Sequence, residues 1–119
     1  MKNERDYSED VIKGVKHEGQ AVILELTGEV DLKSSADLKA KLKELYQDKP
    51  PVIIVDMTEV EFMDSSGLAT LIGALKWCRV NNSELKLVGL IERVRSIFEI
   101  CLLDSVFKIY NSRAEALSS

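Results

Sequence analysis

The segment Asp64-Ser65-Ser66-Gly67 holds the residues of this sequence that are best placed to do chemistry. It lies between the apolar run 52–55 and a helical pattern of leucine and isoleucine residues, so we expect it at the carboxyl end of a strand, where α/β sheets bind ligands. The first turn of a helix has free N–H groups and a dipole that favours an anion. A serine hydroxyl at this place is therefore well positioned to receive a phosphoryl group.

The same four residues also have a purely structural interpretation, because Asp, Ser and Gly are favoured where helices begin. One N-cap is needed, and we expect Ser65 or Ser66 to provide it, with Gly67 relieving crowding. Since three polar residues compete for one cap, at least one hydroxyl should remain accessible. Physical reasoning alone leaves both interpretations open.

The neighbours of this segment are acidic. Glu59, Glu61 and Asp64 surround the two serines in sequence, and no arginine cluster stands nearby to hold a phosphate. A phosphate adds a charge of roughly −1.5 to −2 at pH 7. We therefore expect phosphorylation to repel an acidic or closely packed partner at the surface and to leave the fold intact.

Metal-dependent and hydrolytic chemistry find little support in the sequence. Cys78, Cys101 and the single His17 cannot supply the clustered ligands of a zinc site. We expect both cysteines to be packing residues and His17 to lie at the surface beside a turn. The sequence has no G-x-S-x-G, no G-x-x-x-x-G-K-[ST] and no G-x-G-x-x-G motif. It predicts no metal, no cofactor and no catalytic residue.

Length and composition fit a single domain. The chain has 119 residues, with 16 Lys+Arg against 20 Asp+Glu, for a net charge of −4. This balance argues against a nucleic-acid partner, which usually requires a basic face, and no apolar run approaches the roughly 20 residues that span a bilayer. Residues 1–10 lack the apolar core of a secretory signal. We expect a flexible polar tail at 1–10, one domain at 11–119, no membrane partner and a cytoplasmic location.

The elements that would position the segment alternate between strands and helices. We predict a β-hairpin from 11–16 and 21–27 whose second arm ends at Gly28, a helix capped by Ser34 or Ser35, and a strand 52–55 that ends at Asp56. The predicted elements after the segment are a helix whose apolar pattern runs from Leu68 to Leu75 and which ends at Asn81-Asn82, a strand at 85–90, a helix at 91–98, a strand at 106–110 and a short helix after Ser112.

This order predicts an α/β fold. The β-branched residues 52–55 do not alternate with polar ones, which is typical of a strand covered on both faces. Alternating strands and helices favour parallel pairing with right-handed crossovers. The expected architecture is a mixed sheet with a parallel centre and an antiparallel N-terminal hairpin, with helices packed on the sheet.

Three segments of the chain resemble the STAS domain family, in particular the bacterial anti-sigma factor antagonists. VIIVDMTEVEFMDSSGLATLIGALKWC is similar to the phosphorylation segment of that family, and LTGEVDLKSSADLKAKL is similar to its strand–loop–helix with a G-E-[LV]-D signature. LKLVGLIERVRSIFEICLLDSVFKIY is similar to its closing strand–helix–strand. The segments follow the family's order, and the resemblance extends over about residues 11–117, which implies a STAS-type sheet.

The resemblance implies roles for individual residues. Ser65 would be the phosphoacceptor, while Asp31, Asp64, Ser66 and Gly67 would belong to the partner-binding surface. The partner would be an anti-sigma factor that is also a serine protein kinase, and the unphosphorylated chain would bind it and release the sigma factor. Phosphorylation of Ser65 would switch this binding off, and a serine phosphatase would reset it. In such partner switching the chain regulates transcription and is not itself an enzyme.

Two alternatives remain open at this point. One is a non-phosphorylated STAS interaction subunit of a transport or stress-sensing complex, in which Ser65 would accept no phosphate. The other is a small enzyme or nucleotide-binding α/β domain, against which the missing motifs argue. Ala69 stands where many family members have a second glycine, and we expect this small residue to have little consequence.

Overall fold

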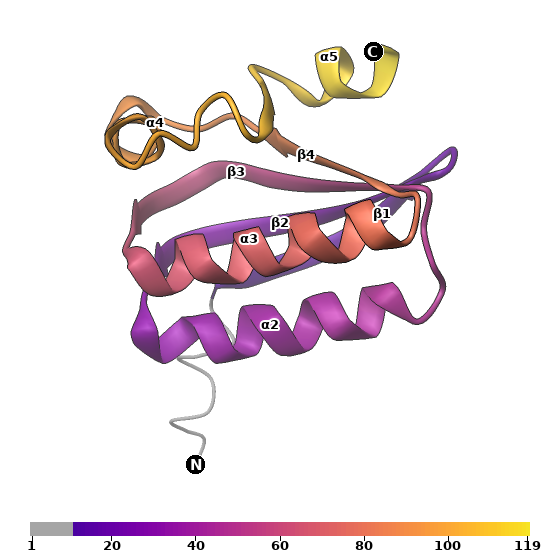
Figure 1. Cartoon of the computed structure of the whole chain (residues 1–119), viewed down its shortest axis with the longest axis horizontal. Helices are drawn as coiled ribbons and strands as arrows, with labels where there is room; N and C mark the ends of the chain where they lie inside the picture. The colour runs from indigo at the N-terminus through magenta and orange to yellow at the C-terminus, as the bar shows by residue number, and fades with distance from the viewer. Residues whose placement is uncertain (1–10) are drawn as a thin grey trace.

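The computed structural model describes residues 11–119; the predicted tail at 1–10 lies outside the described residues. The predicted order of strands and helices is confirmed within them (Figure 1). The elements are β1 (Ile12–Glu18), β2 (Ala21–Val30), α2 (Leu32–Tyr46), β3 (Val52–Met63), α3 (Ser65–Val80), β4 (Glu84–Val88), α4 (Glu92–Ile100), β5 (Lys108–Tyr110) and α5 (Arg113–Ser118).

The strands form one mixed sheet in the order β1-β2-β3-β4-β5. β1 and β2 pair as an antiparallel hairpin, and β2, β3, β4 and β5 pair in parallel. Ile53, Ile54 and Val55 are fully buried, as expected for a strand covered on both faces. The predicted parallel centre and antiparallel N-terminal hairpin are therefore confirmed.

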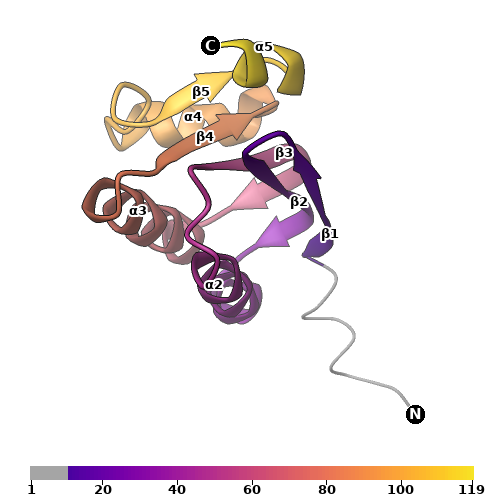
Figure 2. The ribbon, with the colours of Figure 1, turned by 90° about the vertical axis from the view of Figure 1, so that its right-hand side faces the viewer.

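The two faces of the sheet are covered unequally. Helices α2, α3 and α4 contribute to the larger hydrophobic cluster, to which Leu38, Leu71 and Phe98 belong. Helix α5 places Ala116 against Ile54 in a smaller cluster on the other face. Figure 2 shows α2 and α3 side by side along the sheet, with α5 on its opposite side. Most of the apolar burial thus holds α2 and α3, the two helices that frame the predicted segment.

Two predicted strand ends were wrong. β2 does not end at Gly28 and β3 does not end at Asp56, because the two strands stay paired as far as Val30 and Met63. Gly28 adopts a φ of 80°, and the pairing shifts register twice along this stretch. Such irregularities let a strand continue through residues that otherwise read as a loop. As a result β2 and β3 end side by side.

The predictions for the two cysteines and the histidine were confirmed at two residues and wrong at one. Cys78 is buried as predicted, and burial raises the pKa of its thiol to about 11. His17 is exposed, also as predicted. The packing role expected for Cys101 is wrong: this residue is exposed, because α4 ends at Ile100 and Cys101 is its C-cap.

Two further properties bear on the possible classes of function. None of the described helices is long and apolar enough to cross a membrane. Among residues 11–119, no group of three or more His, Cys, Asp or Glu side chains is arranged to hold a metal ion.

Candidate functional site

The candidate site lies at the carboxyl ends of β2 and β3. Val30 and Met63 are register partners, and the Asp64 N–H donates to the Val30 carbonyl at 3.1 Å. Asp31 and Asp64 therefore follow two neighbouring strands at the same edge of the sheet. Two of the three helices of the larger face, α2 and α3, begin here, which is where ligand sites of parallel sheets are found.

Asp64 provides the N-cap of α3. Its Oδ1 accepts hydrogen bonds from the backbone N–H groups of Ser66 at 2.8 Å and Gly67 at 3.3 Å. The prediction that Ser65 or Ser66 is the cap was wrong, because the carboxylate one residue earlier takes that place with an extended backbone. Both serines consequently lie inside the first turn of the helix.

Ser65 is the exposed residue of the segment. Among the described residues no hydrogen bond is made by its Oγ. The N–H groups of Ser66 and Gly67 already donate to the Asp64 carboxylate, so they do not need the Ser65 hydroxyl. Ser66 is half-buried, and its carbonyl accepts a hydrogen bond from Thr70 Oγ1 at 3.0 Å. The site therefore offers a hydroxyl that another protein can reach without first breaking a helix cap.

Asp31 has the same role in α2 that Asp64 has in α3. Its Oδ1 accepts from the backbone N–H groups of Lys33 at 3.0 Å and Ser34 at 3.1 Å. Ser34 completes a capping box, since its Oγ accepts from the Asp31 N–H at 3.0 Å and donates to the Glu29 carbonyl at 2.8 Å. The cap predicted at Ser34 or Ser35 was wrong, and the helix begins at Leu32.

Gly67 is buried where α3 approaches the end of β2. A Cβ at this position would lie 2.7 Å from Met63 Cγ, 2.9 Å from Val30 Cγ1 and 3.0 Å from the Val30 carbonyl. No larger residue fits without moving the helix, because these contacts are shorter than van der Waals separation. Gly67 thus positions Ser65 and Ser66 relative to the sheet and does not itself present a side chain.

The surroundings of the site are less acidic than the sequence suggested. Glu59 forms an ion pair with Lys13 at 2.6 Å, a hydrogen bond that raises the pKa of the lysine. Arg93, from α4, donates to the Glu61 carbonyl at 3.1 Å. Both cations come from segments distant in sequence, so neighbouring residues alone gave no sign of them.

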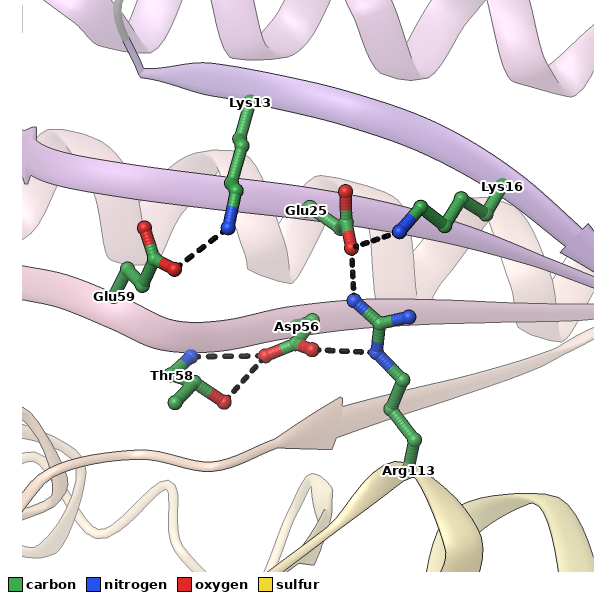
Figure 3. Close-up of polar contacts among 7 residues, drawn as sticks. All are labelled: Lys13, Lys16, Glu25, Asp56, Thr58, Glu59 and Arg113. Atoms are coloured by element: carbon green, nitrogen blue, oxygen red, sulfur yellow. Dashed lines mark hydrogen bonds and ion pairs between the residues drawn. The ribbon is translucent and has the colours of Figure 1, made fainter.

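A salt-bridge network on the other face of the sheet was also missed. Figure 3 shows Arg113 reaching from α5 to two carboxylates, Glu25 on β2 and Asp56 on β3. Its Nε donates to Asp56 Oδ2 at 2.7 Å, and Asp56 Oδ1 accepts from the Thr58 hydroxyl at 2.6 Å. Lys16 Nζ lies 3.3 Å from Glu25 Oε2.

Both carboxyl groups of this network have a lowered pKa. The hydrogen bond from Arg113 is the main cause for Glu25. Burial on its own would raise the pKa of Asp56, but hydrogen bonds from Thr58 and Arg113 outweigh it. The signal in the sequence was a single acidic residue within or directly after each apolar run, since a carboxylate in such a strand requires a cationic or hydrogen-bonding partner.

The chain matches one family model and several curated relatives. The model described as the STAS domain matches residues 13–116. An anti-sigma-B factor antagonist of Listeria monocytogenes is 40% identical over 91 residues, which are 76% of this chain and 79% of the relative. An anti-sigma-B factor antagonist of Staphylococcus aureus is 33% identical over 82 residues, covering 69% of this chain and 76% of the relative.

Solved structures share the fold. A putative anti-sigma factor antagonist from Thermotoga maritima superposes with a TM-score of 0.84 at 23% identity, over 94% of this chain and 96% of the other. The Bacillus protein SpoIIAA in its phosphorylated form superposes with a TM-score of 0.70 at 21% identity, over 88% and 96%. These likenesses confirm the STAS-type sheet expected from the sequence.

Proposed function

The chain belongs to the STAS domain family, and on this basis we propose that it is an anti-sigma factor antagonist controlled by phosphorylation of Ser65. The unphosphorylated protein binds an anti-sigma factor that is also a serine protein kinase, and the sigma factor is released. The kinase transfers the γ-phosphoryl group of ATP to Ser65 Oγ: the bond between the γ-phosphorus and the bridging oxygen breaks, ADP leaves, and the hydroxyl proton is released. A serine phosphatase later hydrolyses the ester and restores the binding-competent form.

The exposure of Ser65 supports this proposal most directly. Its hydroxyl lies at the first residue of α3, and the cap that the helix needs is supplied by Asp64. A phosphate on Ser65 would therefore leave the helix cap intact, and the dipole of the helix N-terminus would stabilise its negative charge. The modification changes the charge of the surface and leaves the packing of α3 in place.

The proposed binding surface is the edge of the sheet at which α2 and α3 begin. Asp31, Asp64 and Ser66 are half-buried there, and Ser65 is exposed beside them. Gly67 contributes by holding the first turn of α3 against β2. A partner seated on this edge would contact the hydroxyl that it phosphorylates, so the added charge repels it directly.

In this function the chain is acted on by enzymes and performs no catalysis of its own. Nucleotide and any metal ion belong to the kinase and the phosphatase. The cycle takes place in the cytoplasm, where sigma factors meet RNA polymerase.

Intact-mass spectrometry tests the proposal. The purified chain is incubated with ATP and an anti-sigma factor of the serine kinase class, and we expect an added mass of about 80 Da, that of one phosphoryl group. Ser65→Ala should remain unmodified, whereas the control variant Ser105→Ala, at an exposed serine outside the proposed binding surface, should be modified like the wild type. An unmodified wild type would favour a non-phosphorylated interaction subunit of a transport or stress-sensing complex. A modified Ser65→Ala variant would assign the acceptor to another residue.

A further inference from the structure

A groove with a volume of about 350 Å³ runs between α2 and α3. Its α3 side is formed by small residues, among them Ala69 and Gly73. Towards the carboxyl ends of the helices it is bounded by Tyr46 and Trp77, whose rings stack with centroids 4.2 Å apart. Burial raises the pKa of Tyr46 to about 12, as expected for a hydroxyl on an apolar wall.

The dimensions of the groove suit a helix. Its α3 side extends from residue 69 to residue 77, about 12 Å at 1.5 Å per residue, which is the length of two helical turns. Gly73 is exposed, and a Cβ there would meet no atom within 4 Å. Small residues let another backbone approach closely, and amphipathic helices commonly place their apolar face in grooves of this kind.

The charged residues that line the groove predict a negatively charged occupant. Lys39 and Lys43, one turn apart on α2, are the charged residues that line it, and no acidic residue does so. Helix α3 itself has no Asp or Glu along its whole length. In a chain of net charge −4 this is a local basic surface, which complements an acidic partner.

The groove is continuous with the proposed phosphoacceptor. Ser65, Ala69 and Gly73 follow at intervals of four residues along α3, so they share one side of the helix. Ser65 therefore stands one turn before the first α3 residue of the groove. A segment lying in the groove and extending past Ala69 would reach the Ser65 hydroxyl.

We propose that the groove between α2 and α3 is the docking site for an acidic amphipathic helix of the anti-sigma factor kinase. The apolar face of this helix rests on Gly73 and Trp77, and its carboxylates lie against Lys39 and Lys43. The inference rests on the proposed function, because it explains how a phosphate on Ser65 releases the partner. The new negative charge stands at the end of the groove and repels the acidic helix.

A pair of substitutions at Gly73 tests whether kinase binding requires the open groove. Gly73→Leu fills the groove, while Gly73→Ala adds one methyl group in open space, and both should stabilise the helix interior because glycine is unfavourable there. By isothermal titration with the kinase, we expect Gly73→Leu to weaken binding at least about tenfold and Gly73→Ala to stay within about twofold. Wild-type affinity in Gly73→Leu would overturn the inference.

A second pair tests the charge. Lys43→Glu reverses a charge inside the groove, and Lys49→Glu makes the same change in the loop after α2, outside the lining. We expect Lys43→Glu to weaken kinase binding about tenfold and to flatten its salt dependence, with Lys49→Glu near the wild type. Equal effects of the two variants would show that net charge alone matters and would overturn the acidic docking helix.

The single tryptophan reports on the occupant directly. With Trp77 replaced by 5-fluorotryptophan, the ¹⁹F resonance should shift when the kinase is added to the wild-type sequence but not when it is added to Gly73→Leu. A shift with protein concentration in the absence of kinase would instead identify a second copy of this chain as the occupant.

The outcomes for the two proposals can be told apart. Phosphorylation of Ser65 with unaltered kinase binding by the groove variants would overturn only the docking helix. Absence of both phosphorylation and kinase binding in the wild type would overturn both proposals.

Discussion

Asp31 and Asp64 occupy equivalent positions one strand apart: each follows the last residue of a parallel strand and caps the helix that begins there. The residues before them, Val30 and Met63, are register partners. This pairing brings the N-termini of α2 and α3 to the same edge of the sheet. The exposed hydroxyl of Ser65 lies at one of these two capped helix starts, so its position depends on both caps and on the pairing beneath them.

Removal of the Asp64 cap should destabilise the protein. Asp64→Ala leaves the Ser66 and Gly67 N–H groups without their acceptor, and we expect the free energy of unfolding to fall by about 1 kcal/mol. Asp64→Ser can still accept these bonds and serves as the control. Urea denaturation monitored by circular dichroism measures both variants. Equal stabilities of the Ala and Ser variants would show that the side chain does not act as a cap.

Two glycines of the same helix should respond oppositely to alanine. Gly67→Ala forces a methyl group against Met63 and Val30, and such overpacking costs about 1–3 kcal/mol. Gly73→Ala places its methyl group in open space and should gain roughly 0.5–1 kcal/mol from helix propensity. Thermal unfolding of the two variants checks this. A stabilised Gly67→Ala would mean that α3 can move away from β2 at no cost.

The order of the elements could be predicted because each apolar run had a recognisable pattern, either helical spacing or an unbroken β-branched stretch. Residues 52–55 showed no alternation, and three of them, Ile53, Ile54 and Val55, proved to be fully buried, while the leucines of α2 and α3 followed helical spacing. The ends of β2 and β3 could not be predicted, because Gly28 and the polar residues after Asp56 are typical of loops. Only the parallel pairing of the two strands, a contact distant in sequence, keeps them extended.

The candidate site was predicted at the level of the segment but not of the cap. Asp, Ser and Asn are nearly equivalent N-caps, so local sequence could not decide between Asp64 and the serines that follow it. The partners of Glu59 and Asp56 were missed for a different reason. Lys13 and Arg113 lie on elements 46 and 57 residues away, and only the fold brings them together.

Loss of Arg113 should weaken the attachment of α5 to the sheet. In Arg113→Met, Glu25 and Asp56 lose their shared cation, and we expect a loss of about 2 kcal/mol at pH 7, because hydrogen bonds to charged groups contribute about 1.5–3 kcal/mol. Lys13→Met breaks an exposed ion pair and should change stability little, since surface pairs contribute little. Chemical denaturation at pH 7 measures the free energy of unfolding of both variants. Equal losses would show that the half-buried pairs of Arg113 stabilise the protein no more than the exposed pair of Lys13.

The contribution of Arg113 should depend on pH. The folded-state pKa values of Glu25 and Asp56 lie below their ordinary values of 4.5 and 3.8, so the stabilisation is fully present above these values. It is lost as the pH falls through the lowered folded-state values. The difference in stability between the wild type and Arg113→Met should therefore be constant from pH 5 to 7 and shrink towards pH 3. A difference that grows on acidification would contradict the assignment.

A negative charge at Ser65 should affect binding and not folding. Ser65→Asp should unfold within about 0.5 kcal/mol of the wild type, because no described residue bonds the Ser65 hydroxyl and an acidic residue in the first helical turn is favourable. Under the proposed function it should bind the kinase at least about tenfold more weakly, as the phosphorylated protein would. Thermal unfolding and titration calorimetry measure the two quantities. A strongly destabilised variant would show that the hydroxyl has a structural role.

The proposed contact at Asp31 must be separated from its role as a cap. Asp31→Ala removes both the charge and the acceptor of the Lys33 and Ser34 N–H groups, so lower kinase affinity could follow from a frayed α2 alone. Asp31→Asn removes the charge but remains a good N-cap, and we expect its unfolding free energy to stay within about 0.5 kcal/mol of the wild type. If the carboxylate contacts the kinase, Asp31→Asn should still bind about tenfold more weakly, because truncating a charged interface pair costs affinity. Wild-type affinity in Asp31→Asn together with weak binding in Asp31→Ala would restrict Asp31 to positioning α2.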